Sequence, residues 1–319
     1  MSTSIRPTPM MPGTAIVTGA TSGLGYECSR VLLSKGWHVV MAVRDLDRGR
    51  AAARALDDPD RCVVMRADLG SLASVRAFVD EYRGAGLPPA RAVICNAALQ
   101  VVSETRSSED GYELTFAVNH LGHFALVQGL LDQLARPSRI VIVSSGTHDP
   151  DQRTGMPAPL DTSAERLAHP EAEADEPVAR LGRRRYTTSK LCNVLFAYEL
   201  DRRLRDGGSA TTVNLFDPGL MPGSGLARDY TGPQRLAWRF VLPVMRVLPH
   251  VHTARTSGRN LAALAGDERF ADVSGKYFLG LDPVSSSADS NDLAKAADLW
   301  ETSERLIAAV GLTGESLRG

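Results

Sequence analysis

The sequence predicts an α/β protein built on one doubly wound parallel sheet, and two patterns support this fold class. Short runs rich in β-branched residues alternate with longer segments of helical periodicity along most of the chain. The short runs are almost continuously apolar, as expected of parallel strands that helices cover on both faces. At 319 residues the chain is long for one domain, yet α/β folds of this size often form a single unit with one large core.

The strands are expected at six places in the chain. In order they are 14–18 (TAIVT), 38–43 (HVVMAV), 62–69 (CVVMRADL), 91–98 (RAVICNAA), 139–145 (RIVIVSS) and 211–219 (TTVNLFDPG). Segments of helical period separate them, which is the pattern of βαβ units and of a Rossmann fold. One segment, 146–185, is rich in proline and charge and reads as an irregular surface insertion. We expect residues 1–12 to be a flexible N-terminus and 13–319 to be one domain.

Composition excludes several classes of partner. Lysine and arginine number 36 against 37 aspartates and glutamates, so no net basic charge is available to hold nucleic acid. We find no signal peptide and no run of about 18 apolar residues, and therefore expect no membrane span and a cytoplasmic protein. The cysteines lack the spacing of a metal site or disulfide scaffold and are predicted to be buried thiols: Cys28, Cys62, Cys95 and Cys192.

The stretch TGATSGLG at 18–25 links the first predicted strand to a helix and contains three glycines. Such a turn presents free backbone N–H groups and the positive end of a helix dipole to an anion. The pyrophosphate of a dinucleotide is the usual occupant, and a tight turn without a ligand is the alternative.

The spacing TGxxxGxG resembles the cofactor loop of the short-chain dehydrogenase/reductase family, and further family motifs follow in the correct order. They are Asp68 and Leu69 in ADL, Asn96, Ala97 and Ala98 in CNAA, Asn119 in AVNHLGHF, Ser145 in VSS, Tyr186 and Lys190 in YxxxK, and Pro218 and Gly219 in the PG turn. The resemblance covers nearly the whole chain and implies a Rossmann-type oxidoreductase that binds a nicotinamide dinucleotide. The implied cofactor contacts are Gly19, Thr21, Ser22, Gly23, Leu24, Gly25, Arg44, Asp68, Leu69, Asn96, Ala97, Ala98, Tyr186, Lys190, Pro218, Gly219 and Leu220.

The pair Tyr186 and Lys190 suits proton transfer to a carbonyl oxygen. A free phenol has a pKa near 10 and is a poor acid at neutral pH. Four residues separate the two, so on a helix they share a face and the ammonium of Lys190 would lower the pKa of Tyr186. The resemblance further implies that Lys190 holds the nicotinamide ribose, that Ser145 bonds the substrate oxygen, and that Asn119 orders a water leading from Lys190 to solvent.

The end of the second predicted strand favours NADPH over NADH. In NAD-preferring relatives an acidic residue there accepts hydrogen bonds from the ribose, and in this sequence the position is Val43. The next residue, Arg44, carries a guanidinium that fits phosphate oxygens, and Ser22 can add a hydroxyl. Asp45 and Asp47 follow, and the preference would weaken if Asp45 faced the ribose.

Within the family, the sequence looks most like the branch of retinol dehydrogenases and light-dependent protochlorophyllide reductases. It has Leu220 where the protochlorophyllide reductases carry a cysteine, which argues against pigment photoreduction. We expect an NADPH-dependent enzyme that reduces a carbonyl, or an activated C=C, of a fairly apolar small molecule. The alternatives are a catalytically silent NADP-binding regulator and a nucleotide-sugar epimerase or dehydratase.

Four further features leave alternatives open. His120 and His123 have a spacing that suits a metal, but no third ligand follows, so packing under the sheet is expected. Arg183, Arg184 and Arg185 are either a patch that binds a phosphate group of the substrate or the solvated end of a loop, and the loop end is preferred. The apolar segment 233–251, broken at Pro243 and Pro249, is either core or part of a substrate lid at 220–255. The helices that bear Asn119 and Tyr186 either pair in a homodimer or stay covered.

Overall fold

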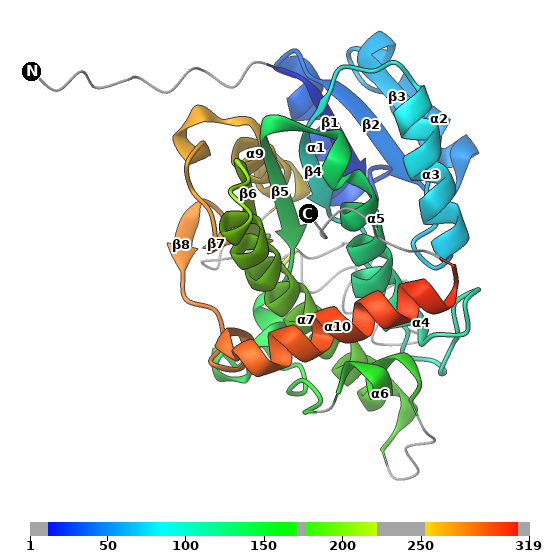
Figure 1. Ribbon diagram of the computed structural model, residues 1–319, viewed down its shortest axis with the longest axis vertical. Helices are drawn as coiled ribbons and strands as arrows, with labels where there is room; N and C mark the ends of the chain where they lie inside the picture. The colour runs from blue at the N-terminus through cyan, green and yellow to red at the C-terminus, as the bar shows by residue number, and fades with distance from the viewer. Residues whose placement is uncertain (1–11, 162, 171–175, 222–252, 312–319) are drawn as a thin grey trace, which may run out of the picture.

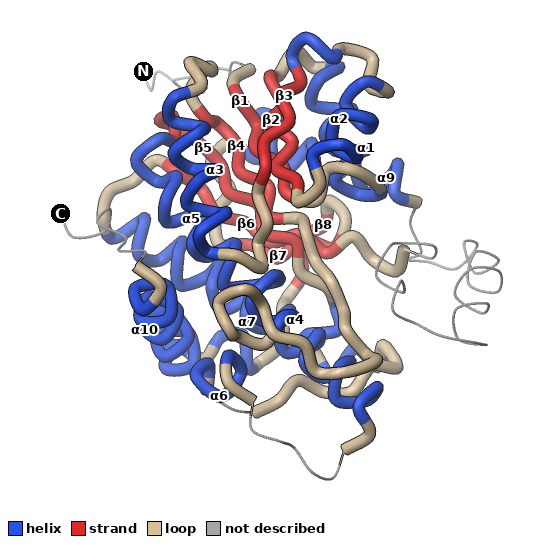
Figure 2. The backbone as a smooth tube through the Cα atoms, turned by 90° about the vertical axis from the view of Figure 1, so that its right-hand side faces the viewer, coloured by secondary structure: helices blue, strands red, loops and turns tan. Residues whose placement is uncertain are grey.

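The computed structural model describes residues 12–161, 163–170, 176–221 and 253–311, and these form one eight-stranded sheet between layers of helices (Figures 1 and 2). The predicted fold class is confirmed. In chain order the strands are β1 Thr14–Thr18, β2 His38–Val43, β3 Cys62–Arg66, β4 Ala90–Cys95, β5 Leu134–Val143, β6 Thr211–Asp217, β7 Lys276–Leu279 and β8 Asp282–Val284.

The sheet order is β3-β2-β1-β4-β5-β6-β7-β8, and only the pairing of β7 with β8 is antiparallel. The chain therefore reverses direction across the sheet between β1 and β4. In open α/β sheets the ligand lies outside the carboxyl ends of the strands at such a switch point. The topology thus places the residues after β1 and β4 at the expected binding crevice.

All six predicted strands are present, although four predicted ranges run too far at the carboxyl end. These strands end at Arg66, Cys95, Val143 and Asp217, so the motif residues that follow lie in loops at the sheet edge. The edge strands β7 and β8 were not predicted, because runs of four and three residues carry little pattern.

Helices cover both faces of the sheet (Figure 2). Their bounds are α1 Gly23–Ser34, α2 Leu46–Arg54, α3 Leu72–Gly84, α4 Leu114–Phe116, α5 Gly122–Leu130, α6 Ala164–Ala168, α7 Val178–Asp206, α9 Ala254–Gly266 and α10 Leu293–Ala309. Alternate strand residues face opposite sides: Ile16 packs in the core under α3, α5 and α7, while Val17 packs under α1, α2 and α9.

Shorter helical turns connect these elements. They are η1 Pro59–Arg61, η2 Ala117–Leu121, η3 Leu131–Gln133, η4 Gly146–His148, η5 Pro150–Gln152, η9 Glu268–Phe270 and η10 Asp289–Asn291. All are 3₁₀ turns except η2, which is a π-helical turn.

The predicted insertion 146–185 extends too far. Its last eight residues, 178–185, form the first two turns of α7, and α6 lies within it. The arginines are therefore not at a loop end. Arg185 is buried and donates to Thr105 Oγ1 at 2.7 Å, and Arg184 pairs with Glu176 at 3.0 Å.

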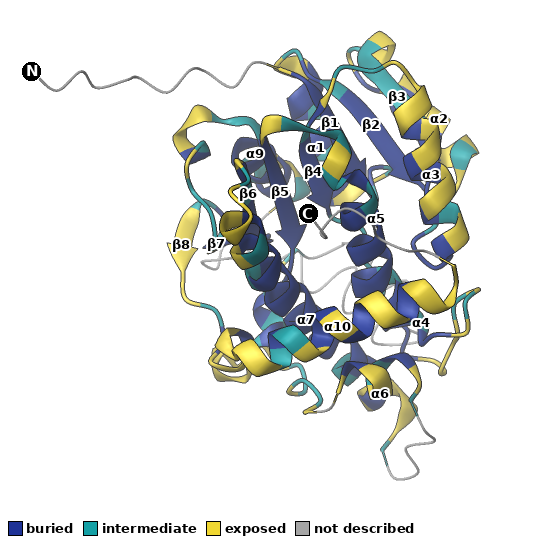
Figure 3. Cartoon of the chain, in the orientation of Figure 1, coloured by how far each residue is buried: buried dark blue, intermediate teal, exposed yellow. Residues whose placement is uncertain are grey.

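The helix α10 covers α5 and α7. The sequence left open whether the helices that bear Asn119 and Tyr186 pair in a homodimer or are covered by the chain itself. Figure 3 shows the inner side of α10 buried and its outer side exposed. Trp300 is 1% exposed and its ring meets those of Phe124 and Phe196, with centroids at 5.0 and 6.0 Å. The guanidinium of Arg203 lies 4.3 Å from the same ring. The chain itself thus covers this face.

Several sequence predictions lie wholly or mostly outside the described residues. These are the flexible N-terminus, segment 233–251 with Pro243 and Pro249, and most of the proposed lid at 220–255. Within the described ranges, one continuous helical stretch, Leu114–Gln133, is long and apolar enough to span a membrane, but it is largely buried as a core helix. Of the cysteines, Cys62 is only partly buried, contrary to prediction, because the edge strand β3 carries it.

Candidate active site

The glycine loop joins β1 to α1 in a conformation that requires glycine. Gly19 and Gly23 have φ of 65° and 60°, in the left-handed region that other residues rarely adopt. A Cβ atom at Gly25 would lie 2.6 Å from the carbonyl oxygen of Gly19, so the loop has no room for it. Leu24 is buried in the core, whereas Ser22 and Gly23 are exposed at the loop tip. The loop therefore exposes backbone at the start of α1.

The loops after β1 and β4 are joined by side-chain hydrogen bonds. Thr18 Oγ1 accepts from the backbone N–H groups of Asn96 and Ala97, each at 2.9 Å. In return, Asn96 Nδ2 donates to the carbonyl oxygen of Thr18 at 2.8 Å. Ala98 follows, partly exposed. These bonds fix the two loops that flank the switch point.

The residues present fit a bound dinucleotide. The first turn of α1 contains no acidic residue, so its positive dipole end is not neutralised there. A Cβ atom at Gly23 would meet no described atom within 4 Å, which leaves the surface above the loop open. After β3, Asp68 Oδ1 accepts from Gly70 N at 3.0 Å, while Leu69 is buried.

An exposed arginine, Arg44, follows the end of β2. Val43 is buried and Arg44 is exposed, with no hydrogen bond or ion pair to any residue that the structure describes. Asp45 is the N-cap of α2, and its Oδ1 accepts from the N–H of Arg48 at 3.0 Å. The carboxylate that complicated the sequence argument is therefore engaged in capping.

The helix α7 brings Tyr186 and Lys190 onto one buried face, 6% and 2% exposed. The Nζ of Lys190 lies 5.6 Å from the centre of the Tyr186 ring and donates to the carbonyl oxygen of Val143 at 3.2 Å. Burial lowers the pKa of the Lys190 ammonium from 10.5 to about 8, and the charge of Asp217 opposes this shift.

The loop after β5 carries Ser145 beside these residues. Buried Ser144 donates through Oγ to the carbonyl oxygen of Lys190 at 2.9 Å, which ties the loop to α7. Ser145 is partly exposed, and its Oγ accepts from Thr147 N at 3.3 Å. His148 Nδ1 bonds the carbonyl oxygen of Ser145 at 2.8 Å, and its Nε2 accepts from Ser287 N at 3.1 Å. Buried His148 thus links the loop that carries Ser145 to the backbone at Ser287.

Asn119 lies in the π-helical turn η2, a local irregularity often found at functional sites. Its side chain accepts from Leu99 N at 2.8 Å and donates to Leu99 O and to Ser189 Oγ, both at 2.9 Å. Ser189 in turn donates to the carbonyl oxygen of Tyr186 at 2.7 Å. Asn119 therefore connects the loop after β4 to the turn of α7 that carries Tyr186.

The PG turn after β6 is fixed by a buried carboxylate. Asp217 Oδ1 accepts from Gly219 N at 2.9 Å, and its Oδ2 accepts from the hydroxyl of Tyr277 at 3.0 Å. Gly219 has φ of 73°, and Pro218 O accepts from Ser257 Oγ at 2.9 Å. Burial and the charge of Asp217 raise the pKa of Tyr277 well above its usual value of 10.

Comparison with known proteins identifies the family. The model of the short chain dehydrogenase family matches residues 13–154. The chain is 34% identical over 320 residues to protochlorophyllide reductase A of Oryza sativa subsp. japonica, covering 93% of this chain and 81% of that relative. The chain is a short-chain dehydrogenase/reductase.

Other relatives agree with the branch predicted from the sequence. The chain is 34% identical over 302 residues to polyprenol dehydrogenase of Danio rerio, covering 92% of this chain and 86% of that protein. A crystal structure of an uncharacterized protein from Mycobacterium Paratuberculosis is 31% identical with a TM-score of 0.70, covering 94% and 95% of the two chains. A blue fluorescent protein in complex with NADPH, 22% identical with a TM-score of 0.62 over 85% of this chain and 97% of that one, shares the fold.

Several residues that build this site were not singled out from the sequence: Thr18, His148, Asp217 and Tyr277. His123 was singled out, but only as a residue that packs under the sheet. These residues act on their neighbours through buried hydrogen bonds between loops far apart in the chain, and no local motif marks such bonds. The two histidines of the NHLGH stretch are held by protein groups, His120 by Ser303 and His123 by Thr18 and Asn119.

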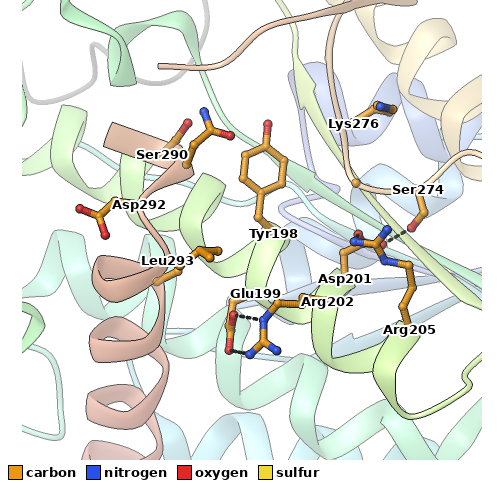
Figure 4. Close-up of a pocket in the computed structure, with 13 residues that line it drawn as sticks. Tyr198, Glu199, Asp201, Arg202, Arg205, Ser274, Lys276, Ser290, Asp292 and Leu293 are labelled. Atoms are coloured by element: carbon orange, nitrogen blue, oxygen red, sulfur yellow. Dashed lines mark hydrogen bonds and ion pairs between the residues drawn. The ribbon is translucent and has the colours of Figure 1, made fainter. Parts of the chain in front are cut away.

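A concave region lies away from these motifs, between α7, β7 and the start of α10 (Figure 4). This open groove has a volume of about 390 Å³. Its charged side chains are largely paired, with Arg202 bonded to Glu199 at 2.7 Å and Arg205 to Asp201 at 2.9 Å. None of the predicted site residues lines it.

Proposed function

We propose that this protein is an NADPH-dependent oxidoreductase that transfers a hydride between the nicotinamide and a carbonyl or alcohol, or to an activated C=C, of a fairly apolar small molecule. The observation that carries the proposal is the buried pair of Tyr186 and Lys190 on α7. Asn119 bonds Ser189 of the same helix, and the loop of Ser145 is tied to it through the neighbouring Ser144. A silent regulator would not need such a pair, and the spacing TGxxxGxG differs from the TGxxGxxG typical of nucleotide-sugar epimerases.

The cofactor would lie along the glycine loop, from Gly19 to Gly25, with further contacts from Asn96 and the PG turn. When bound, it supplies the hydride for reduction. Exposed Arg44 and Ser22 would bind the 2′-phosphate, because a guanidinium fits phosphate oxygens. The engagement of Asp45 as a helix cap supports this choice of NADPH.

The protein side of the reaction is proton transfer at the substrate oxygen. We assign Tyr186 as general acid in reduction and general base in oxidation. The ammonium of Lys190, 5.6 Å from the centre of the Tyr186 ring, would favour the tyrosinate form. Ser145 would donate a hydrogen bond to the substrate oxygen, and Asn119 would hold the water that leads from Lys190 to solvent.

The apolar character of the substrate has two supports. Two relatives are named for protochlorophyllide and polyprenol, both large apolar molecules. The segment 233–251 is also apolar, and we propose that it belongs to a cover over the substrate. Leu220 replaces the cysteine of the light-dependent enzymes, so we propose a reaction that proceeds in the dark.

Titration of NADPH and NADH into wild type and Arg44→Ala tests the cofactor assignment. A charge-assisted hydrogen bond contributes about 1.5–3 kcal/mol, so the Kd for NADPH should rise by about one to two orders of magnitude. The Kd for NADH should hardly change. Arg50→Ala is the matched control, because Arg50 is exposed on α2 but pairs with Asp47 at 3.6 Å. Equal losses for both cofactors in Arg44→Ala would contradict the assignment.

A further inference from the structure

His123 is buried beneath the glycine loop and has a hydrogen-bond partner at each ring nitrogen. It lies in the first turn of α5 and is 1% exposed. Its Nε2 is 2.9 Å from Thr18 Oγ1, and its Nδ1 is 3.1 Å from the carbonyl oxygen of Asn119. The ring therefore spans the gap between the end of β1 and the π-helical turn.

The chemistry of the partners fixes the proton on one nitrogen. A carbonyl oxygen only accepts, so Nδ1 of His123 must carry the hydrogen that bonds Asn119. Thr18 Oγ1 already accepts from two backbone N–H groups, those of Asn96 and Ala97. Its own hydrogen then has two acceptors in reach, His123 Nε2 at 2.9 Å and Ile94 O at 3.3 Å. The shorter bond goes to the histidine, whose Nε2 is an acceptor in this tautomer.

The result is a series of hydrogen bonds that meets at Asn119. Backbone N–H groups of the β4 loop donate to Thr18, Thr18 donates to His123, and His123 donates to the backbone carbonyl oxygen of Asn119. The side chain of the same asparagine donates through Nδ2 to Ser189 Oγ, which donates to the carbonyl oxygen of Tyr186. Every group in the series is buried or half-buried. Burial also lowers the pKa of His123 to about 4, so the ring is neutral at pH 7.

We propose that His123 is a positioning residue, a neutral Nδ1-protonated bridge that fixes the glycine loop relative to the Asn119–Tyr186 side of the site. The role rests on the proposed function, because the two sides must hold cofactor and proton donor in register. Thr18 directly precedes Gly19, so a shift of Thr18 moves the loop. A misplacement of about 1 Å between reacting groups can lower a rate by about 10².

Turnover of His123→Phe and His123→Asn tests the bridge. Phenylalanine fills the space without polar atoms, and kcat should fall about 10- to 100-fold while the Kd for NADPH changes by less than about 3-fold. Asparagine carries an N–H donor where Nδ1 stands and should restore part of kcat through the bond to Asn119. His120→Phe is the matched control, since His120 is equally buried three residues earlier but bonds Ser303 on α10. Its kcat per folded molecule should match wild type.

A spectroscopic measurement keeps this inference separate from the proposed function. In ¹⁵N-histidine NMR spectra at pH 7, His123 should show a protonated Nδ1 and an unprotonated Nε2, and Thr18→Val should shift the Nε2 resonance. A protonated Nε2, or a loss of kcat in His123→Phe no larger than in His120→Phe, would overturn the proposal. If the wild type reduces no carbonyl compound, the proposed function fails, and the spectra still decide the bridge.

Discussion

The lysine proposed for catalysis should make the folded protein less stable than an apolar residue would. Lys190 is 2% exposed, and burial lowers its pKa from 10.5 to about 8. Each pKa unit corresponds to about 1.4 kcal/mol, so the buried ammonium costs about 3 kcal/mol at neutral pH. Lys190→Met keeps the length of the side chain and removes the charge.

The substitution leaves few groups without partners. The carbonyl oxygen of Val143 loses Lys190 but still accepts from Asn193 Nδ2 at 3.3 Å. Asp217 keeps its bonds from Gly219 and Tyr277. The lost hydrogen bond offsets about 1 kcal/mol of the roughly 3 kcal/mol that removal of the buried ammonium gains. Lys190→Met should therefore be more stable than wild type by about 1–3 kcal/mol at pH 7.

The difference should depend on pH with a definite sign. Below about pH 8 the lysine is charged in both the folded and unfolded states, so its full cost is present. From about pH 8 to 10.5 the folded state loses the proton first, the unfolded state binds more protons, and wild-type stability rises relative to the variant. Urea unfolding of both proteins from pH 7 to 10.5 measures this. A variant less stable at pH 7, or a difference that does not change with pH, would refute the reasoning.

Two further predictions concern Asp217 in the proposed site and helix α10. Because the charge of Asp217 raises the pKa of Lys190, Asp217→Asn should move the alkaline limb of the kcat profile for carbonyl reduction to lower pH; an unmoved limb would show that the two charges do not interact. Trp300→Ala removes the buried ring between α10 and the helices beneath it, which should cost about 3–5 kcal/mol and lower Tm by about 4–8 °C in calorimetry. A change in Tm below about 2 °C would mean that α10 does not stabilise this face.

Much of the fold was predictable because a parallel sheet buries its strands on both faces and leaves long apolar runs. The glycine loop, YxxxK and the PG turn were predictable because each is a local spacing. The start of α7 was not predictable, because the run Arg183, Arg184 and Arg185 resembles a solvated loop. The burial of Arg185 becomes visible only in the folded chain. The cover of α5 by α10 depends on a contact between segments far apart, Phe124 and Trp300.

In the proposed site, too, local spacings were predictable and contacts between distant segments were not. Sequence spacing predicts Tyr186 and Lys190 on one helix face, which the structure has. It does not predict that Asp217 lies near the ammonium, because Asp217 ends β6 while Lys190 lies on α7. It also does not predict that His148 holds the Ser145 loop, because His148 is itself fixed by Ser287, which is 139 residues away in the chain. The π-helical turn around Asn119 also has no signal in the residue pattern.

The central claim is that Tyr186 transfers the proton when a hydride reduces a carbonyl. Stopped-flow loss of NADPH absorbance, with a panel of apolar ketones and aldehydes, compares wild type with Tyr186→Phe in a single turnover. Wild type should oxidise NADPH with at least one compound, and the variant should bind NADPH with nearly the same Kd but react at least about 10²-fold more slowly. Near-wild-type turnover by Tyr186→Phe would contradict the account.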